Sequence, residues 1–372
     1  MMLRQEMARL AKSILDDPVA GAPQADFTIS PESGEEAASI LQFASEHDLR
    51  VLFWGGGTHQ GMGYRLEPAV IMTTRRLNQI VEWQEEDLTV VVQPGVLVAD
   101  LEEELSNRSQ TAVLAETPGP ATVGGAIASA QSGWRRYRYG PIRDRMLEVR
   151  LATGDGRLVR GGGRLVKNVT GYDLPRLATG SFGSLGLITE MCLKLWPVPP
   201  EQAMVRVDDI DRALAGAYRP LALVETTAGA TLYLAGSPEE IEAQASAVGG
   251  SVIAGHDWPV PLSASIEMVL RVPPGTVGAW VGALRTVGAD FQAAHGVGEI
   301  RFAADTVPVE DLTAFRENAE SMGGALVVVR APDDFELDPW GTPPNSADLQ
   351  RSVKAAFDPI GVANRGILPG GI

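Results

Sequence analysis

Apolar residues follow a helical period in some parts of this chain and a strand period in others. Ser33 and Glu36 form the S-x-x-E pattern that caps helices, and apolar residues at helical spacing follow from 37 to 44, which predicts a helix. Residues 51–54 are continuously apolar and predict that a strand covers 50–54. The glycine-rich stretch 53–63 therefore begins at the carboxyl end of a strand, where ligands of α/β structures tend to bind.

The same patterns continue as far as a group of prolines. Strands are predicted at residues 70–72, 89–93, 146–153, 157–160 and 187–196, and an acidic amphipathic helix at 98–105. The sequence Gly154-Asp155-Gly156 lies between two of these strands and predicts a hairpin. Pro197, Pro199 and Pro200 end the long last strand and indicate a domain boundary.

The chain beyond these prolines reads as two similar halves of strands around helices. The first half predicts strands at 203–207, 221–226 and 231–234, with helices at 208–217 and from Ser237; the second predicts strands at 266–272, 298–303 and 325–330, with helices at 275–287 and 309–322. This order indicates a split βαβ sheet with helices on one face. We therefore expect an α+β protein with domains at 1–200 and 201–345, and a C-terminal segment at 346–372.

Composition narrows the classes of function. The chain has 31 Lys and Arg against 47 Asp and Glu, a formal net charge of −16, which disfavours binding to nucleic acid. Its one cysteine, Cys192, and its four scattered histidines offer no metal-ligand spacing, so no metal site is expected. The N-terminus lacks the pattern of a secretory signal and no window has the apolar length of a membrane span, so we expect a cytoplasmic protein.

Two glycine-rich loops indicate a large phosphorylated ligand. The loop FWGGGTHQGMG at 53–63 has five glycines, and the loop PGPATVGGAIAS at 118–129 has three. Residues without a Cβ allow backbone N–H groups to converge on an anion. A flexible glycine turn would explain the first loop equally well, and a helix N-terminus capped by Thr122 would explain part of the second.

Several segments, taken together, resemble flavoproteins of the vanillyl-alcohol oxidase type, which have a PCMH-type FAD-binding domain. They resemble most closely the FAD-binding small subunit of bacterial glycolate oxidase complexes. Besides the two loops, the resemblance rests on VVVQPGVLVADLEEEL (90–105), YGPIRDRMLEVRLATGDG (139–156), VKNVTGYDLPRLATGSFGSLGLITEMCLKLWPVP (166–199) and FDPIGVANRG (357–366). The family implies an FAD-binding domain of two α+β subdomains, an α+β cap domain with an antiparallel sheet, and a final segment that returns to the FAD domain.

The resemblance assigns cofactor contacts to particular residues. The expected FAD-binding residues are Gly55, Gly56, Gly57, Thr58, His59, Pro118, Gly119, Thr122, Gly124, Gly125, Ser129, Gly186 and Ile188. Thr58 stands where covalent members place a flavin-linking histidine, so the resemblance implies non-covalent FAD. His59, one position later, is either a linkage site or a loop histidine near phosphate. Trp54 replaces the arginine that the family has before the glycines.

The catalytic residues are not identified by the sequence. His295 and Arg301, in AAHGVGEIRF at 293–302, are candidates because hydride transfer to flavin needs a base and an anchor for a substrate carboxylate. Equally, Gly296 and Gly298 could form a turn, with His295 structural and Arg301 a solvated strand residue.

The resemblance also implies partners. It predicts a subunit that works with a larger FAD-binding catalytic subunit and an iron–sulfur subunit on glycolate or another small 2-hydroxy acid, at the inner face of the membrane through these partners. Two alternatives stand beside it. One is a stand-alone FAD-dependent oxidase of a small hydroxylated substrate, and the other is a non-catalytic scaffold subunit with a degraded flavin site.

Overall fold

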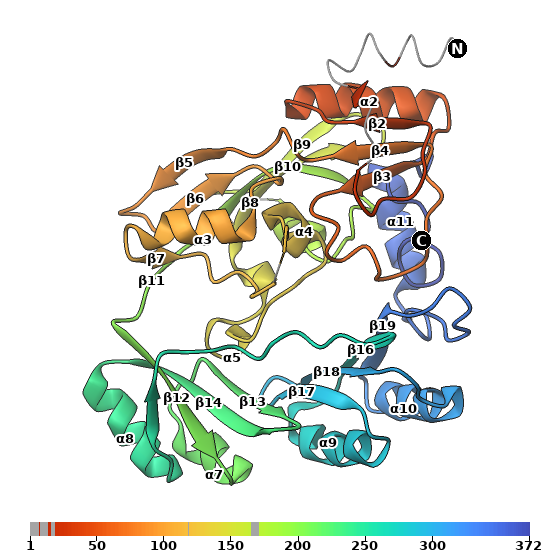
Figure 1. The fold of residues 1–372 in the computed structure, drawn as a ribbon. Coiled ribbons are helices and arrows are strands. Elements are labelled where there is room, and N and C mark those ends of the chain that lie inside the picture. Colours follow the sequence, from red (N-terminus) through yellow and green to blue (C-terminus); the bar gives the residue numbers. More distant parts are fainter. Residues whose placement is uncertain (1–6, 8–13, 16–18, 118, 165–170) are drawn as a thin grey trace.

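The computed structural model describes residues 7, 14–15, 19–117, 119–164 and 171–372. Two smaller sheets and their helices form one lobe, and a single large sheet with four helices forms a second lobe, which we call the cap (Figure 1). Pro118 and the start of the segment 166–199, as far as residue 170, lie outside the described residues. The α+β fold class predicted from the sequence is confirmed.

The first sheet places the start of the glycine-rich loop. It has the order β1-β2-β4-β3, formed by β1 (Ile14–Leu15), β2 (Phe27–Ile29), β4 (Val70–Thr73) and β3 (Val51–Trp54). Helix α2 (Gly34–Glu46) packs beside it, and Ser33 caps α2 by accepting a hydrogen bond from the N–H of Glu36 at 3.1 Å. Strands β2, β4 and β3 are parallel, so their carboxyl ends lie at one edge of the sheet.

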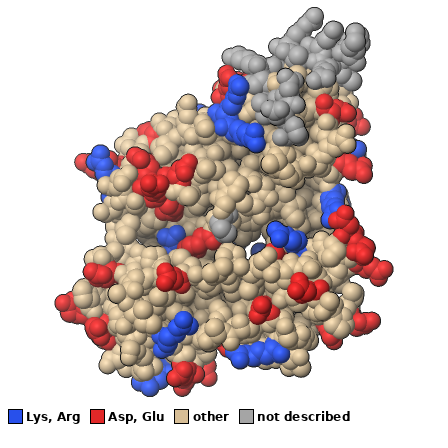
Figure 2. Space-filling view, viewed as in Figure 1, with Lys and Arg blue, Asp and Glu red and all other residues tan. Residues whose placement is uncertain are grey.

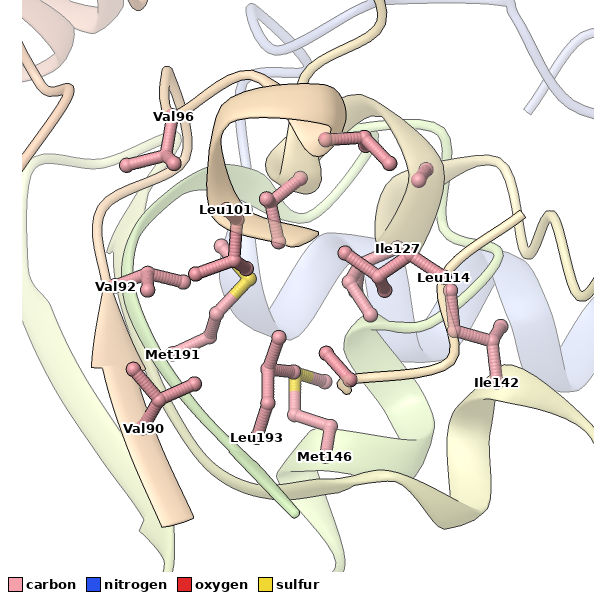
Figure 3. Packing of buried hydrophobic residues seen from close by; sticks show 14 of the residues in the cluster. Val90, Val92, Val96, Leu101, Leu114, Ile127, Ile142, Met146, Met191 and Leu193 are labelled. Carbon is pink, nitrogen blue, oxygen red and sulfur yellow. The ribbon is translucent and has the colours of Figure 1, made fainter. Parts of the chain in front are cut away.

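The second sheet is antiparallel and carries the other loop. Its order is β5-β6-β10-β8-β9, formed by β5 (Ile80–Gln84), β6 (Thr89–Val92), β10 (Gly186–Lys194), β8 (Met146–Thr153) and β9 (Leu158–Gly162). Helices α3 (Val98–Ser106) and α4 (Val123–Ala128) cover one face. Figure 3 shows Leu101 and Ile127 from these helices meeting Val92, Met191 and Leu193 from the strands, so α4 is anchored by a dry core.

Short elements complete this lobe. They are the ribbon of β7 (Gln110–Thr111) and β11 (Trp196–Pro197), helices α5 (Arg136–Tyr139) and α6 (Leu174–Ala178), and the 3₁₀ turn η1 (Ile142–Asp144). Arg145 is fully buried next to η1 and donates hydrogen bonds to the carbonyls of Val113, Ser132 and Gly140. Burial lowers the pKa of Arg145 to about 10. It therefore holds the segment around α5, which faces the cap.

The cap is one antiparallel sheet built from two copies of the same motif. The first copy has β12 (Glu201–Val207), α7 (Ile210–Gly216), β13 (Ala222–Thr226), β14 (Gly229–Gly236), α8 (Pro238–Val248) and β15 (Val252–Ala254). The second has β16 (Ile266–Arg271), η2 (Pro274–Thr276), α9 (Val277–Thr286), β17 (Asp290–Ala294), β18 (Glu299–Ala304), α10 (Val309–Ser321) and β19 (Ala325–Arg330). The order β15-β12-β14-β13-β17-β18-β16-β19 joins them through β13 and β17, and the four helices lie on the face away from the first lobe (Figure 1).

The chain then returns to the first lobe. Helix α11 (Ala347–Phe357) ends beside Asp358, and the following segment runs parallel to β3, with Ala363 opposite Val51. The buried Lys354 Nζ and Asp358 Oδ2 lie 2.9 Å apart, and Lys354 also donates to the carbonyls of Ser184 and Ala363. The domain limits at 200 and 345 stay a prediction.

Candidate functional site

A cavity lies between the two smaller sheets, where the glycine-rich loops meet. Phe53 and Trp54, at the end of β3, form part of its wall, and the first residues of β10 form another part. Of the residues that the sequence assigned to the cofactor, the following line it: Gly55, Gly56, Gly57, Thr58, His59, Thr122, Gly124, Gly125, Ser129, Gly186 and Ile188. Segments that are far apart in the sequence are therefore brought together as expected. Gly119 is not among the lining residues, and Pro118 lies outside the described residues.

Glycine is required in the first loop because the second loop touches its backbone. A Cβ at Gly56 would lie 1.6 Å from the carbonyl oxygen of Pro120, and one at Gly55 would lie 2.3 Å from Thr122 Oγ1. Neither position can carry a side chain unless the loops separate. The glycines thus hold the two loops in contact as well as leaving backbone exposed toward the cavity.

The backbone of the first loop offers hydrogen-bond donors. In the described part of the chain, no acceptor is found for the N–H groups of Gly55, Gly56, Gly57, Thr58 and His59. Consecutive free N–H groups in a glycine-rich turn are suited to the oxygens of a phosphate or pyrophosphate. This observation fits the phosphate-bearing part of FAD.

The second loop differs from the expectation. The N–H of Gly124 donates to the carbonyl of Pro94 at 2.9 Å, and the N–H of Gly125 donates to Thr122 Oγ1 at 3.2 Å. The start of α4 therefore does not present these two N–H groups to an anion, as the sequence had predicted, because Thr122 and Pro94 accept from them. Gly124 and Gly125 contribute close packing and a wall of the cavity instead.

The cavity carries little formal charge. Among the described residues that line it, none is a lysine or an arginine. Trp54, which replaces the family arginine, is buried and packs with Leu52 and Ile71. A bound phosphate would thus be held by backbone dipoles and by shape.

His59 is the one titratable group in this wall among the described residues. Its Nδ1 lies 2.9 Å from Thr58 Oγ1. Burial and, to a smaller extent, the positive charge of Arg301 together lower the pKa of His59 to about 4. The imidazole is therefore neutral at pH 7 in the absence of a bound anion.

Asn364 is a lining residue that sequence reasoning missed. Its Oδ1 accepts from the N–H of Phe53 at 2.9 Å, and its Nδ2 donates to the carbonyl of Phe182 at 2.6 Å. It joins the C-terminal segment to both walls of the cavity. The motif FDPIGVANRG indicated that this segment returns here, but not that Asn364 bridges the walls.

His295 is not a catalytic candidate in this structure. It is 4% exposed, and its Nε2 lies 2.8 Å from Glu225 Oε2. Glu225 also pairs with Arg285 of α9 at 2.8 Å, which places the group on the helix-covered face of the cap sheet. The proposed role in taking a substrate proton is corrected, because the imidazole is turned away from the first lobe and bonded to Glu225.

Arg301 lies on the opposite face of the cap sheet. Its guanidinium stacks on the ring of Trp134 at 4.7 Å, and Trp134 belongs to the first lobe. Arg301 is therefore a residue of the junction between cap and first lobe, and its charge acts on His59. The described residues contain no group of three or more His, Cys, Asp or Glu that could hold a metal ion, and no helix that could span a membrane.

Comparisons with known proteins agree with this geometry. Residues 25–162 match the family model of an FAD binding domain. This chain is 36% identical to the glycolate oxidase subunit GlcD of Bacillus subtilis (strain 168), over 47% of this chain and 37% of the relative. It is 34% identical to the mitochondrial D-lactate dehydrogenase [cytochrome] of Arabidopsis thaliana, over 47% of this chain and 31% of the relative. The chain thus spans 37% and 31% of these two relatives.

The fold also matches solved structures. An alkyldihydroxyacetonephosphate synthase superposes with a TM-score of 0.65 at 16% identity, over 94% of this chain and 78% of that chain. At this identity the match concerns the fold alone. The matched region, residues 25–162, is an FAD-binding domain, and FAD is its cofactor.

Proposed function

We propose that this protein is an FAD-dependent oxidoreductase that acts on a 2-hydroxy acid, as the FAD-binding subunit of a complex that oxidises glycolate or another small 2-hydroxy acid. The observation that carries the proposal is the cavity between the two glycine-rich loops, with its row of free N–H groups, inside a region that matches an FAD-binding domain. The activities for which the relatives are named support the reaction class, and the name of the Bacillus relative supports a subunit role.

The chain's own residues would bind and enclose the cofactor. The first loop would hold the pyrophosphate through its N–H groups, and Ile188 and Phe182, which also line the cavity, would help to exclude water from it. FAD held at this site would supply the acceptor for the hydride that is removed from the substrate carbon. His59 of the cavity wall feels the charge of Arg301, which packs on Trp134 where cap and first lobe meet, so we propose that the substrate enters at this junction.

Loss of a glycine in the first loop tests the cofactor site. We expect Gly56→Ala to lose bound FAD, because its Cβ would lie 1.6 Å from the Pro120 oxygen and would push the loops apart. The measurement is the flavin absorbance of the purified protein and the flavin released by acid. Gly278→Ala is a matched control, since a Cβ there meets nothing within 4 Å, and it should keep full flavin content.

The reaction is tested by anaerobic reduction of the bound flavin. Bleaching by glycolate or D-lactate in the isolated chain would support a stand-alone enzyme, and bleaching only with partner proteins present would support the subunit. A colourless protein that takes up no added FAD would contradict the proposal and would favour a scaffold.

A further inference from the structure

Three arginines converge on one carboxylate at the junction between cap and first lobe. Arg271 at the end of β16 lies opposite Glu299 of β18, and Arg301 follows two positions later on the same strand. Arg136 reaches the same carboxylate from α5 of the first lobe. The cluster thus contains residues of both lobes.

The contacts within this cluster are long. Arg136 Nη1 and Arg271 Nε lie 3.8 and 3.9 Å from Glu299 Oε2, and Arg301 Nη2 lies 3.3 Å from Oε1. Paired guanidinium and carboxylate groups usually approach to about 2.7–2.9 Å. Glu299 therefore leaves much of the hydrogen-bonding capacity of the three guanidiniums unused.

The cluster also has an excess of positive charge. Three arginines face one glutamate, and among the described residues no other carboxylate oxygen lies within ion-pair distance of these guanidiniums. The neighbouring arginines hold the pKa of Glu299 below its usual range despite burial. In a chain with a formal charge of −16, such an excess is unusual. Figure 2 shows blue and red side chains along the hollow between the lobes.

The position of the cluster connects it to the cofactor cavity. Arg271 lines a second hollow that shares Met62, Ser129 and Phe182 with the cavity. Arg301 stacks on Trp134 and acts electrostatically on His59. The arginine side chains are 30–43% exposed, so an anion in solution can reach them.

We propose that Arg136, Arg271 and Arg301 form a binding site for a small dianion at the junction between cap and first lobe. The substrate would then be a 2-hydroxy acid that carries a second anionic group, either a carboxylate or a phosphate, rather than glycolate. Glu299 occupies part of the site when it is empty and orients the arginines. That the bound dianion is a substrate rests on the proposed function. That the three arginines bind a dianion does not.

Calorimetric titration of the full chain with unreactive anions tests the site. We expect malonate or inorganic phosphate to bind at least about 10-fold more tightly than acetate. Arg271→Gln and Arg301→Gln should each weaken this binding about 10- to 100-fold. Arg330→Gln is the matched control, because Arg330 pairs with Glu267 elsewhere in the cap, and should leave the affinity unchanged.

A variant that is expected to bind more tightly shows that weaker binding by the arginine variants is not caused by misfolding. Glu299→Gln removes the internal anion and should strengthen binding of malonate. Tighter binding of malonate than of phosphate would indicate a dicarboxylate, and the reverse order would indicate a phosphorylated hydroxy acid.

Equal affinity for acetate and the dianions, or arginine variants that bind like the control, would overturn the proposal. Malonate cannot be oxidised by hydride loss from a hydroxyl-bearing carbon. Binding of malonate without flavin reduction by any 2-hydroxy acid, in the isolated chain and with partner proteins present, would therefore refute the proposed function and leave the anion site standing.

Discussion

At the residue scale, the neutral state of His59 makes the stability of the flavin-free protein against unfolding fall at acidic pH. The pKa is lowered from 6.5 to about 4 in the folded chain, so between these values the unfolded state binds more protons. His59 then contributes stability that is present above pH 6.5 and is lost as the pH falls toward 4.

We expect this histidine to make unfolding easier at pH 5 than at pH 7 by up to about 2 kcal/mol. The measurement is urea unfolding of flavin-free protein at both pH values, compared with His59→Gln, because other groups titrate in this range too. With FAD bound the phosphates should oppose this loss. Identical pH dependence in the two proteins would show that His59 does not titrate as described.

Residues also show where sequence reasoning was limited. The glycine positions were predictable because a missing Cβ has few explanations at the end of a strand. The role of His295 was not, because the face of the sheet on which it lies depends on the register of β17 against β13. The role of Asn364 was not predictable either, since its side chain forms hydrogen bonds with two residues that are more than 180 positions away from it in the sequence.

At the element scale, α11 is attached by a buried ion pair. Asp358 accepts hydrogen bonds from the N–H groups of Gly361, Val362 and Ala363 as well as from Lys354. Lys354→Met would leave the Asp358 carboxylate buried and without its cation. We expect a loss of about 3–5 kcal/mol in the free energy of unfolding.

An exposed pair in the same helix provides the comparison. Arg351 and Asp348 are solvent-exposed partners at 2.8 Å, and Arg351→Met should cost about 0–1 kcal/mol. Denaturant unfolding of both variants measures the difference. Equal losses would mean that burial of the Lys354 pair is energetically unimportant.

Most elements were predictable from periodicity, and the exceptions have a physical reason. Strand β17, with the sequence DFQAA, was not predicted because four of its five residues are buried and no polar alternation is left. Its burial follows from its place in the middle of the cap sheet, between β13 and β18. Strand β15 is a three-residue edge strand and is too short to produce a periodic signal.

At the scale of the whole molecule, the end of the first glycine-rich loop is bonded to the segment that leaves the cap. Tyr64 donates a hydrogen bond to Asp338 at 2.8 Å, and Arg65 pairs with Asp333. Asp338 also accepts from the N–H groups of Trp340 and Gly341. Cap and cofactor loop are thereby mechanically connected.

We expect Asp338→Ala to speed the release of FAD about 5-fold, since loss of these exposed bonds weakens the connection by about 1 kcal/mol. The rise of flavin fluorescence after dilution measures the release. Asp334→Ala, four positions earlier and exposed, is the control. An unchanged rate would mean that the loop holds FAD independently of the cap.

The return of the chain to the first lobe determines when the cofactor can be loaded during synthesis. Gly56 and Ile188 are made before the cap, whereas Asn364 and Ile367 follow it, and all four line the same cavity. A ribosome-bound chain that has already folded its two smaller sheets still lacks the part of the cavity wall that Asn364 and Ile367 form. We therefore expect flavin to bind late in synthesis, and a nascent chain that stalls within the cap to have an incomplete cavity that retains flavin poorly.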